Sequence, residues 1–201
     1  MIYLVRHGET ELNATRVVQP ADTPLNAQGI AQAARLAQRL RGAGVELILC
    51  SDLPRARMTA DPIARETLAP VEYTPLLQER NFGDLRGRPY AEIGMEIFGP
   101  DFVPPAGEGW PEFDERASAA WALVTERAHA LAGNLVVVTH GLVCASMARR
   151  HLSIPQGVEL PARWGNTSVT VCERIAPHAV QLLNCVVHLD GGDDGSAPSG
   201  L

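Results

Sequence analysis

The stretch Met1–Asn13, MIYLVRHGETELN, decides the fold because an apolar strand runs directly into charged side chains. Residues 2–5 are apolar apart from the phenol of Tyr3, and Arg6 and His7 follow at once. A guanidinium beside an imidazole is costly to bury without partners. We therefore expect this strand to present its last residues to a ligand.

Strand and helix patterns alternate along the chain after this stretch. The expected elements are, in order, helix 25–41, strand 45–50, helix 54–68, strand 71–77, short helix 89–98, a Gly- and Pro-rich loop over 99–111, helix 112–131 and strand 135–138. Such alternation is typical of a mostly parallel sheet with helices on both faces. Long loops in compact domains often bind ligands, so the 99–111 loop is a candidate binding loop.

The last third of the chain has a different pattern. β-branched residues alternate on both sides of Ala176 and Pro177, which predicts a hairpin that gives the sheet an antiparallel edge. From Asp190 on, the chain is polar and rich in Gly, and we expect residues 190–201 to be a disordered tail. The predicted fold class is α/β, a single-domain sandwich over residues 1–189 with helices on both faces of the central sheet.

Composition limits the partners of this protein. The formal net charge of -6 over 201 residues argues against non-specific binding to nucleic acid or a membrane surface, so a bound anion needs a local cluster of cations. The four cysteines show no C-x-x-C spacing and are expected to be reduced core residues. With no basic leader followed by an apolar run, and no apolar stretch of about 18 residues, a cytoplasmic protein is expected. The composition is also compatible with a homodimer.

Polar side chains follow four of the predicted strands at the point where each strand ends. In chain order these are His7 after the first strand, Arg55 after the second, Glu79 after the third and His140 after the fourth. Because the carboxyl ends of parallel strands meet at one edge of a sheet, we expect these side chains to converge there.

The chemistry of this set points to phosphate. The guanidinium forks of Arg6 and Arg55 match phosphate oxygens, with a protonated His140 as a further cation. A neutral His7 imidazole, held unprotonated by the neighbouring guanidiniums, can act as a nucleophile. The Glu79 carboxyl, with its pKa raised by a nearby phosphate dianion, can donate a proton to a leaving oxygen.

Six blocks of this chain resemble, in order, the motifs of the histidine phosphatase superfamily, in the branch that includes cofactor-dependent phosphoglycerate mutases and small phosphomonoesterases. The blocks are LVRHGET, DTPLNAQG, SDLPRARMTA, LQERNFGDLRGRPYAE, PPAGEGWPEFDER and VVVTHG. The resemblance covers almost all of the chain from Ile2 to Arg174.

The resemblance implies a role for each matching residue. His7 would be phosphorylated, and the phosphoryl oxygens would be held by Arg6, Arg55 and His140, with a further hydrogen bond from Asn13. Glu79 would donate the proton, the fold would be a mixed α/β sandwich, and neither a metal nor a cofactor would take part. A metal site is also disfavoured by the residues themselves, since there is no H-x-H or H-E-x-x-H spacing and two arginines would repel a cation.

Two segments depart from the family pattern. Residues 14–21 have Pro20 where the family places Gly, and AGEGW stands where the family has G-G-E-S. In the family, both segments affect which substrate is bound and not the reaction itself. Because the 14–21 loop departs from the pattern, the resemblance does not assign substrate contacts to Arg16 or Gln19.

These features favour a metal-independent phosphomonoesterase that acts through a phosphohistidine on a small phosphorylated metabolite. A phosphoglycerate-type mutase is the first alternative, since Arg86 and Arg88 lie in the 82–110 segment. That segment is otherwise apolar and acidic, which favours the phosphatase. A protein that binds phosphate without catalysis is an alternative of a different class.

Overall fold

The computed structural model describes residues 1–190, apart from the side chains of residues 95 and 96. The strands are β1 (Ile2–Arg6), β2 (Val45–Ser51), β3 (Val71–Thr74), β4 (Asn134–Thr139), β5 (Val169–Cys172) and β6 (Val180–Cys185). The helices are α1 (Glu11–Ala14), α2 (Ala27–Leu40), α3 (Pro54–Thr67), α4 (Tyr90–Ile93), α5 (Trp110–Ala130) and α6 (Gly141–His151). The tail expected over residues 190–201 lies outside the described residues except for Asp190.

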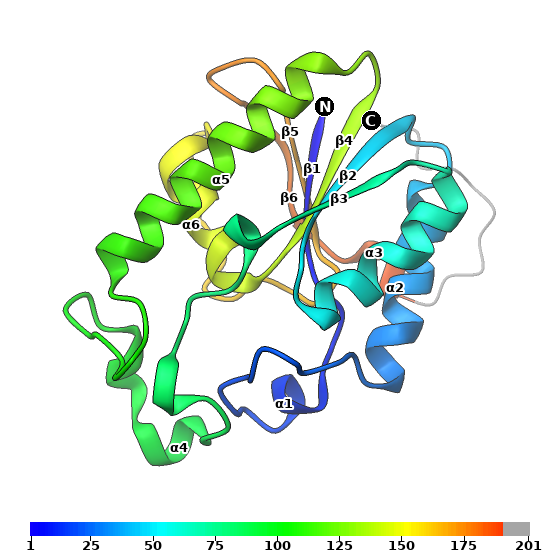
Figure 1. Cartoon of the computed structure of the whole chain (residues 1–201). Helices are drawn as coiled ribbons and strands as arrows, with labels where there is room; N and C mark the ends of the chain where they lie inside the picture. Colours follow the sequence, from blue (N-terminus) through cyan, green and yellow to red (C-terminus); the bar gives the residue numbers. More distant parts are fainter. Residues whose placement is uncertain (191–201) are drawn as a thin grey trace.

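The six strands form one sheet in the order β3-β2-β4-β1-β5-β6 (Figure 1). β1 to β4 pair in parallel, whereas β5 pairs antiparallel with both β1 and β6. This arrangement confirms the predicted fold class, a mostly parallel sheet with an antiparallel edge. The expected hairpin around Ala176 and Pro177 is the connection between β5 and β6.

The sheet is covered on both faces, and alternation along the strands assigns side chains to each face. α5 and α6 lie on one face, and α2 and α3 lie on the other (Figure 1). Ile2 and Leu4 of β1 belong to the core beneath α5 and α6, and Tyr3 and Val5 belong to the core beneath α2 and α3. Because both faces are buried, the central strands are almost continuously apolar in sequence.

The third strand is shorter than expected. β3 ends at Thr74 because Pro75 starts a 3-10 turn over Pro75–Leu77, in which the Thr74 hydroxyl accepts a hydrogen bond from the Leu76 N–H at 3.3 Å. The turn redirects the chain so that Glu79 follows it at the carboxyl edge of the sheet. α5 begins at Trp110, two residues earlier than expected, with Pro111 in its first turn.

The segment between Phe82 and Glu108 forms a small layer of its own beside this edge (Figure 1). Its helix expected over 89–98 is divided at Gly94, which has φ +87°, into α4 and a 3-10 turn over Met95–Phe98. Phe82, Leu85 and Ile97 pack with Val18 in a separate apolar cluster. Among the described helices, none combines the length and apolar character needed to cross a membrane.

Candidate active site

The polar residues at the strand ends converge as expected. The ring centroids of His7, after β1, and His140, at the N-terminus of α6, are 5.1 Å apart. A cavity of about 920 Å³ is lined by five of the six candidates, Arg6, His7, Asn13, Arg55 and Glu79. His140 is fully buried and is not one of the lining residues.

The His7 imidazole is held in one tautomer. Its Nδ1 lies 2.6 Å from the Gly8 carbonyl oxygen, and since a carbonyl can only accept, Nδ1 carries the proton and donates it. Burial, followed by the positive charges of Arg55 and Arg6, holds the pKa of His7 well below its ordinary value. The ring is therefore neutral near pH 7, with the lone pair on Nε2.

Close packing fixes the loop that carries His7. A Cβ atom on Gly8 would lie 2.7 Å from the Gly29 carbonyl oxygen, and one on Gly29 would lie 2.0 Å from the Glu9 carbonyl oxygen, so only glycines allow α2 to approach this loop. The Gly8 N–H donates to the Thr59 hydroxyl at 3.0 Å, which adds a bond to α3. The nucleophile candidate thus sits on a rigid support.

Two buried arginines flank His7 without a carboxylate partner. Arg6 donates to the Trp164 carbonyl, and Arg55 donates to the Pro20 carbonyl at 3.2 Å; their exposed fractions are 7% and 2%. Burial lowers the pKa of Arg55 to about 10, which leaves it charged near neutral pH. Among the described residues, neither arginine forms an ion pair. Buried cations without a counter-ion are costly, and such an arrangement is typical of an anion site.

The state of His140 differs from the expectation. Burial, followed by the charge of Arg55, holds the pKa of His140 well below its ordinary value, which favours a neutral ring in the protein alone rather than the protonated form that we expected. Its Nε2 lies 2.9 Å from the Ser51 hydroxyl oxygen. The buried polar atoms without a hydrogen-bond partner in the described part of the chain include His140 Nδ1, Arg6 Nε and Arg55 Nε. A neutral His140 can still donate one hydrogen bond.

Glu79 has the opposite pKa shift. Its two carboxylate oxygens accept backbone N–H groups, Oε1 from Arg80 at 3.0 Å and Oε2 from Leu142 at 3.1 Å. Burial nevertheless raises the pKa of Glu79 above its ordinary value, and it outweighs these two bonds and the nearby arginines. The rise that we expected from a phosphate dianion is therefore present in the protein alone, for a different reason.

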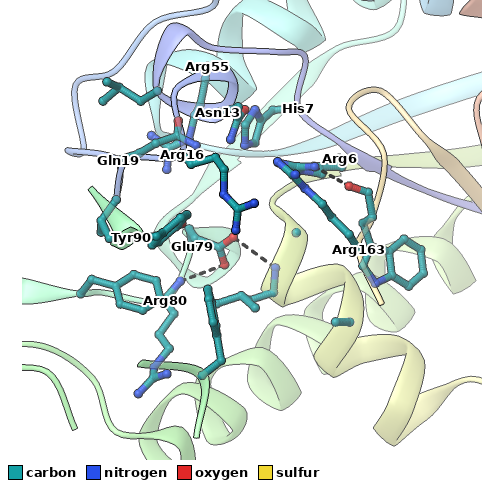
Figure 2. Close-up of a pocket in the computed structure, with 18 of the residues that line it drawn as sticks. Arg6, His7, Asn13, Arg16, Gln19, Arg55, Glu79, Arg80, Tyr90 and Arg163 are labelled. Atoms are coloured by element: carbon teal, nitrogen blue, oxygen red, sulfur yellow. Dashed lines mark hydrogen bonds between the residues drawn. The ribbon is translucent and has the colours of Figure 1, made fainter. Parts of the chain in front are cut away.

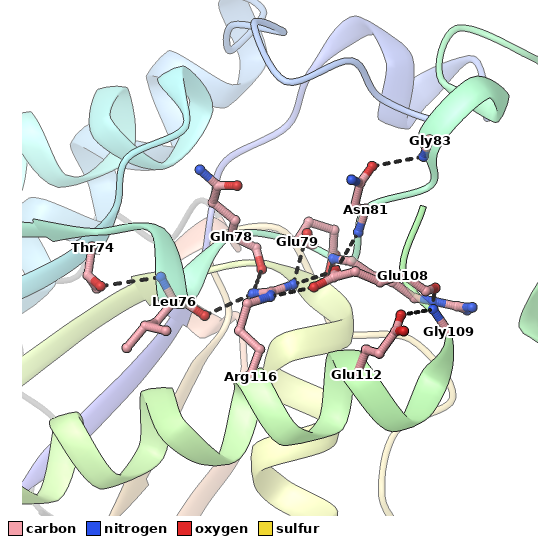
Figure 3. A network of polar contacts seen from close by, with 11 residues as sticks. Thr74, Leu76, Gln78, Glu79, Asn81, Gly83, Glu108, Gly109, Glu112 and Arg116 are labelled. Atoms are coloured by element: carbon pink, nitrogen blue, oxygen red, sulfur yellow. Dashed lines mark hydrogen bonds and ion pairs between the residues drawn. The ribbon is translucent and has the colours of Figure 1, made fainter. Parts of the chain in front are cut away.

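A polar network on α5 holds the backbone of Glu79, as Figure 3 shows. Arg116 donates to the carbonyls of Leu76 at 2.9 Å, Gln78 at 2.7 Å and Glu79 at 3.3 Å. Its guanidinium also pairs with both oxygens of Glu108, at 2.7 and 2.8 Å. The sequence does not predict this network, because contacts between residues about 40 positions apart follow no local pattern.

Asn13 lines the cavity, but its side chain already has partners. Its Oδ1 accepts the Thr10 N–H at 3.3 Å, in the capping box of α1, and the Asn166 Nδ2–H at 3.2 Å. An Asn side chain also has two amide N–H donors, so Asn13 can still bind an anion.

The cavity extends well beyond these residues (Figure 2). Its lining includes several residues that the sequence did not assign to the site: Arg16, Gln19, Arg86, Tyr90, Arg149, Arg163 and Trp164. Arg16 and Gln19 come from the 14–21 loop, which departs from the family pattern. Arg163 and Trp164 come from the connection between α6 and β5, for which the sequence offered no signal. In the described part of the chain, no group of three or more His, Cys, Asp and Glu residues is arranged to hold a metal ion.

Comparison with known proteins gives a consistent result. A family model described as histidine phosphatase superfamily (branch 1) matches residues 2–185. The probable phosphoglycerate mutase GpmB of Proteus mirabilis is 35% identical over 182 residues, which cover 84% of this chain and 82% of that protein. The adenosylcobalamin/alpha-ribazole phosphatase of Escherichia coli is 34% identical over 164 residues, with 77% and 80% covered.

A solved structure shows the same similarity. The crystal structure of the alpha-ribazole phosphatase from Shigella flexneri superimposes with a TM-score of 0.75 at 28% sequence identity. The superposition covers 92% of this chain and 96% of that chain.

Proposed function

The chain belongs to the histidine phosphatase superfamily, branch 1, and from this membership we propose that it hydrolyses small phosphomonoesters through a phosphohistidine on His7, without a metal. One observation carries the proposal: a neutral His7 with its Nδ1–H bound to the Gly8 carbonyl lies between the buried cations Arg6 and Arg55. This arrangement supports an in-line attack by Nε2 on a phosphorus atom whose oxygens the cations hold.

In the first step, Arg6, Arg55 and Asn13, which line the cavity, donate hydrogen bonds to the phosphoryl oxygens. His140 does not line the cavity, and it would join them through its Nδ1, which has no partner in the described residues. The Nε2 lone pair of His7 forms a bond to phosphorus while the ester P–O bond breaks. The leaving oxygen takes the proton of the Glu79 carboxyl. The raised pKa of Glu79 supports this role, because its carboxyl keeps the proton at higher pH than an ordinary glutamate does.

In the second step, a water molecule attacks the phosphohistidine. The O–P bond forms, the N–P bond breaks, and the Glu79 carboxylate takes the proton of the water. Release of inorganic phosphate returns His7 to its neutral form and Glu79 to its acid form. Glu79 therefore donates a proton in the first step and accepts one in the second, while His7 is the nucleophile in the first step and the leaving group in the second.

The mutase alternative has its own observation. The P. mirabilis relative is named a probable phosphoglycerate mutase, whereas the E. coli relative is named a phosphatase. A mutase must keep its phosphohistidine from water, and the cavity here includes the apolar side chains of Phe82, Phe98 and Trp110. The binding-only alternative is disfavoured because both a nucleophile and an acid are in place. A cytoplasmic location and a homodimer stay predictions.

The first experiment measures phosphate release from p-nitrophenyl phosphate in EDTA. We expect wild-type turnover to persist in the chelator and to fall at least about 10³-fold in His7→Ala, because no other group can replace the nucleophile. His129→Ala is the matched control, since His129 is exposed on α5 and does not line the cavity. An acid-labile phosphoryl group should be trapped on the wild type and not on His7→Ala.

Three results distinguish the alternatives. Activity that is lost in EDTA and restored by a divalent cation contradicts the metal-independent mechanism. Interconversion of phosphoglycerate isomers without phosphate release favours the mutase. Tight phosphate binding with no phosphoryl group trapped favours the binding-only protein.

A further inference from the structure

Ser51 places a hydroxyl beside the second histidine of the site. It is the last residue of β2, and β2 pairs in parallel with β4, whose end at Thr139 leads into His140 (Figure 1). The two strand ends therefore bring together side chains that are 89 positions apart in the chain. Ser51 Oγ and His140 Nε2 are 2.9 Å apart, and both residues are fully buried.

The hydrogen bonds of this buried pair have to be satisfied by the protein itself. In the described part of the chain, the Ser51 hydroxyl has two partners, His140 Nε2 and the Leu53 N–H, which donates to Oγ at 3.4 Å. Because the Leu53 N–H can only donate, His140 Nε2 is the one described group that can accept the hydroxyl proton. The other ring nitrogen, Nδ1, is buried without a partner among the described residues.

A neutral His140, which its lowered pKa favours, has two tautomers that leave different numbers of groups unpaired. With the proton on Nδ1, the hydroxyl donates to the Nε2 lone pair, and only the Nδ1–H lacks a partner in the described residues. With the proton on Nε2, the ring donates to the hydroxyl, and both the hydroxyl proton and the Nδ1 lone pair lack such partners. Each buried polar group left unpaired is costly, so the contacts favour the Nδ1–H tautomer.

The unpaired Nδ1–H belongs to a ring that lies among the candidate phosphate-binding groups. The ring centroids of His140 and His7 are 5.1 Å apart. The next residue, Gly141, lines the cavity, and a Cβ atom on it would lie 3.4 Å from Arg6 Nε. Arg6 Nε and Arg55 Nε are also buried donors without partners in the described residues. Unpaired donors gathered around His7 are expected where an anion binds.

We propose that Ser51 is a positioning residue for the reaction: its hydroxyl donates to Nε2 of His140 and so keeps the proton on Nδ1, where it can bond to a phosphoryl oxygen. Ser51 itself does not line the cavity. The inference rests on the proposed phosphatase function and deepens it, because it names the group that keeps a neutral His140 a hydrogen-bond donor. The bond from Leu53 also ties this hydroxyl to the start of α3, the helix that carries Arg55.

Nuclear magnetic resonance of protein labelled with ¹⁵N in histidine tests the tautomer without substrate. A protonated ring nitrogen and a nitrogen with a lone pair have well-separated shifts, and the His140 signals are those that disappear in His140→Ala. At about pH 7.5, above the ordinary pKa of histidine, we expect the Nδ1–H tautomer in the wild type. Ser51→Ala should lose this preference, because the donor to Nε2 is gone, whereas Ser51→Thr keeps the hydroxyl and should keep the tautomer.

Binding and kinetics show whether the tautomer matters to the phosphoryl group. In Ser51→Ala, we expect affinity for inorganic phosphate, measured by calorimetry, to fall about fivefold or more, and kcat/KM for p-nitrophenyl phosphate to fall about tenfold or more. When Ser51→Ala is combined with His140→Ala, its further effect on phosphate affinity should stay within about twofold, because Ser51 acts through His140.

Ser168→Ala is the matched control for Ser51→Ala. Ser168 is also a buried serine that does not line the cavity, but its hydroxyl has no partner among the described residues. We expect this variant to keep the wild-type tautomer and phosphate affinity. An equal loss of phosphate affinity in both alanine variants would contradict a specific role for Ser51.

The outcomes distinguish failure of this inference from failure of the proposed function. An Nε2–H tautomer in the wild type overturns the inference without any variant, and so does a Ser51→Ala protein that keeps the Nδ1–H tautomer and the wild-type phosphate affinity. Phosphate release that depends on His7 would still support the phosphatase in these cases. An Nδ1–H tautomer that Ser51→Ala loses together with phosphate affinity, in a protein that hydrolyses no ester, supports the role of Ser51 and contradicts the phosphatase.

Discussion

Burial shifts the two acid–base groups of the cavity in opposite directions. The pKa of His7 lies well below its ordinary value, so this candidate nucleophile stays neutral into the acid range, whereas the pKa of Glu79 lies above its ordinary value. Pairs of titratable groups separated in this way mark a base or nucleophile and an acid. We therefore expect a pH window, between the lowered pKa of His7 and the raised pKa of Glu79, in which His7 is neutral and Glu79 is protonated.

Glu79→Gln tests the acid role. We expect kcat for an alkyl phosphate to fall about 10² to 10⁴-fold, and kcat for an aryl phosphate to fall less because its leaving group needs less help from a proton. In the wild type, alkyl ester hydrolysis should decline as pH rises through the raised pKa of Glu79, and this decline should be absent in the variant. A wild-type profile that is flat from about pH 5 to 9 contradicts this assignment.

At the scale of elements, Arg80 connects the 97–108 segment to the strand end that carries Glu79. Its guanidinium donates to the carbonyls of Phe102 at 2.6 Å, Glu108 at 3.0 Å and Ile97 at 3.3 Å, and it lies 4.0 Å over the Trp110 ring. Arg80 is only 2% exposed, and its guanidinium nitrogens are bonded to carbonyls of the protein. We therefore interpret Arg80 as a structural cation rather than a ligand-binding one.

Arg80→Lys should loosen this segment while leaving the phosphoryl centre in place. One ammonium cannot reproduce three bonds from a planar guanidinium, and each buried carbonyl left unpaired costs about 1–3 kcal/mol of unfolding free energy. We expect faster amide hydrogen exchange over residues 97–108 and a larger change in KM than in kcat. Arg88→Lys is the control, and equal exchange rates in the two variants would contradict the anchoring role.

The C-terminal turn is a second connection between elements. Arg39 of α2 donates to His188 Nδ1 at 3.0 Å, so the proton of the neutral ring is on Nε2, which lies 3.1 Å from the Thr167 hydroxyl. Asn166, the residue before Thr167, donates from Nδ2 to the His7 carbonyl at 3.1 Å. Residues near both ends of the described chain are thereby linked to the His7 loop.

At the scale of the whole molecule, buried histidines make folding depend on pH. The pKa values of His7 and His140 are well below the ordinary value, and burial lowers the pKa of His188 to about 4. The unfolded chain then binds more protons than the folded protein between about pH 6.5 and the folded pKa values, so stability falls as pH drops through this range. Glu79, with its raised pKa, opposes this trend because its contribution falls as pH rises.

Urea unfolding at several pH values between about 7.5 and 4.5 tests this dependence. We expect the free energy of unfolding to decrease toward acid pH in the wild type. His188→Asn should be less stable near pH 7.5, because it loses the bond to Thr167, and its difference from the wild type should narrow as pH falls toward 4.5. A difference that stays constant over the whole range contradicts a depressed pKa for His188.

Particular residues show how far the sequence could predict this protein. The apolar strands that end on Arg6 and His7, and on His140, predicted a parallel sheet and the convergence of these residues, because strand direction places their carboxyl ends at one edge. The end of β3 at Thr74 and the division of the 89–98 helix at Gly94 were not predicted, since tertiary packing decides such boundaries. Arg116 and Arg163 were not assigned at all, because their contacts join segments far apart in the chain.

Apolar periodicity and motifs within single segments were enough to predict the succession of strands and helices along the chain, the family and the candidate phosphoryl centre, because each of these depends on residues close together in sequence. The protonation of the site and the shape and charge of the cavity around it depend instead on how the whole chain packs. Burial, which depends on the packing of the whole chain, keeps His140 neutral and raises the pKa of Glu79. The same packing brings Arg16 and Arg163, nearly 150 residues apart in the chain, to one cavity.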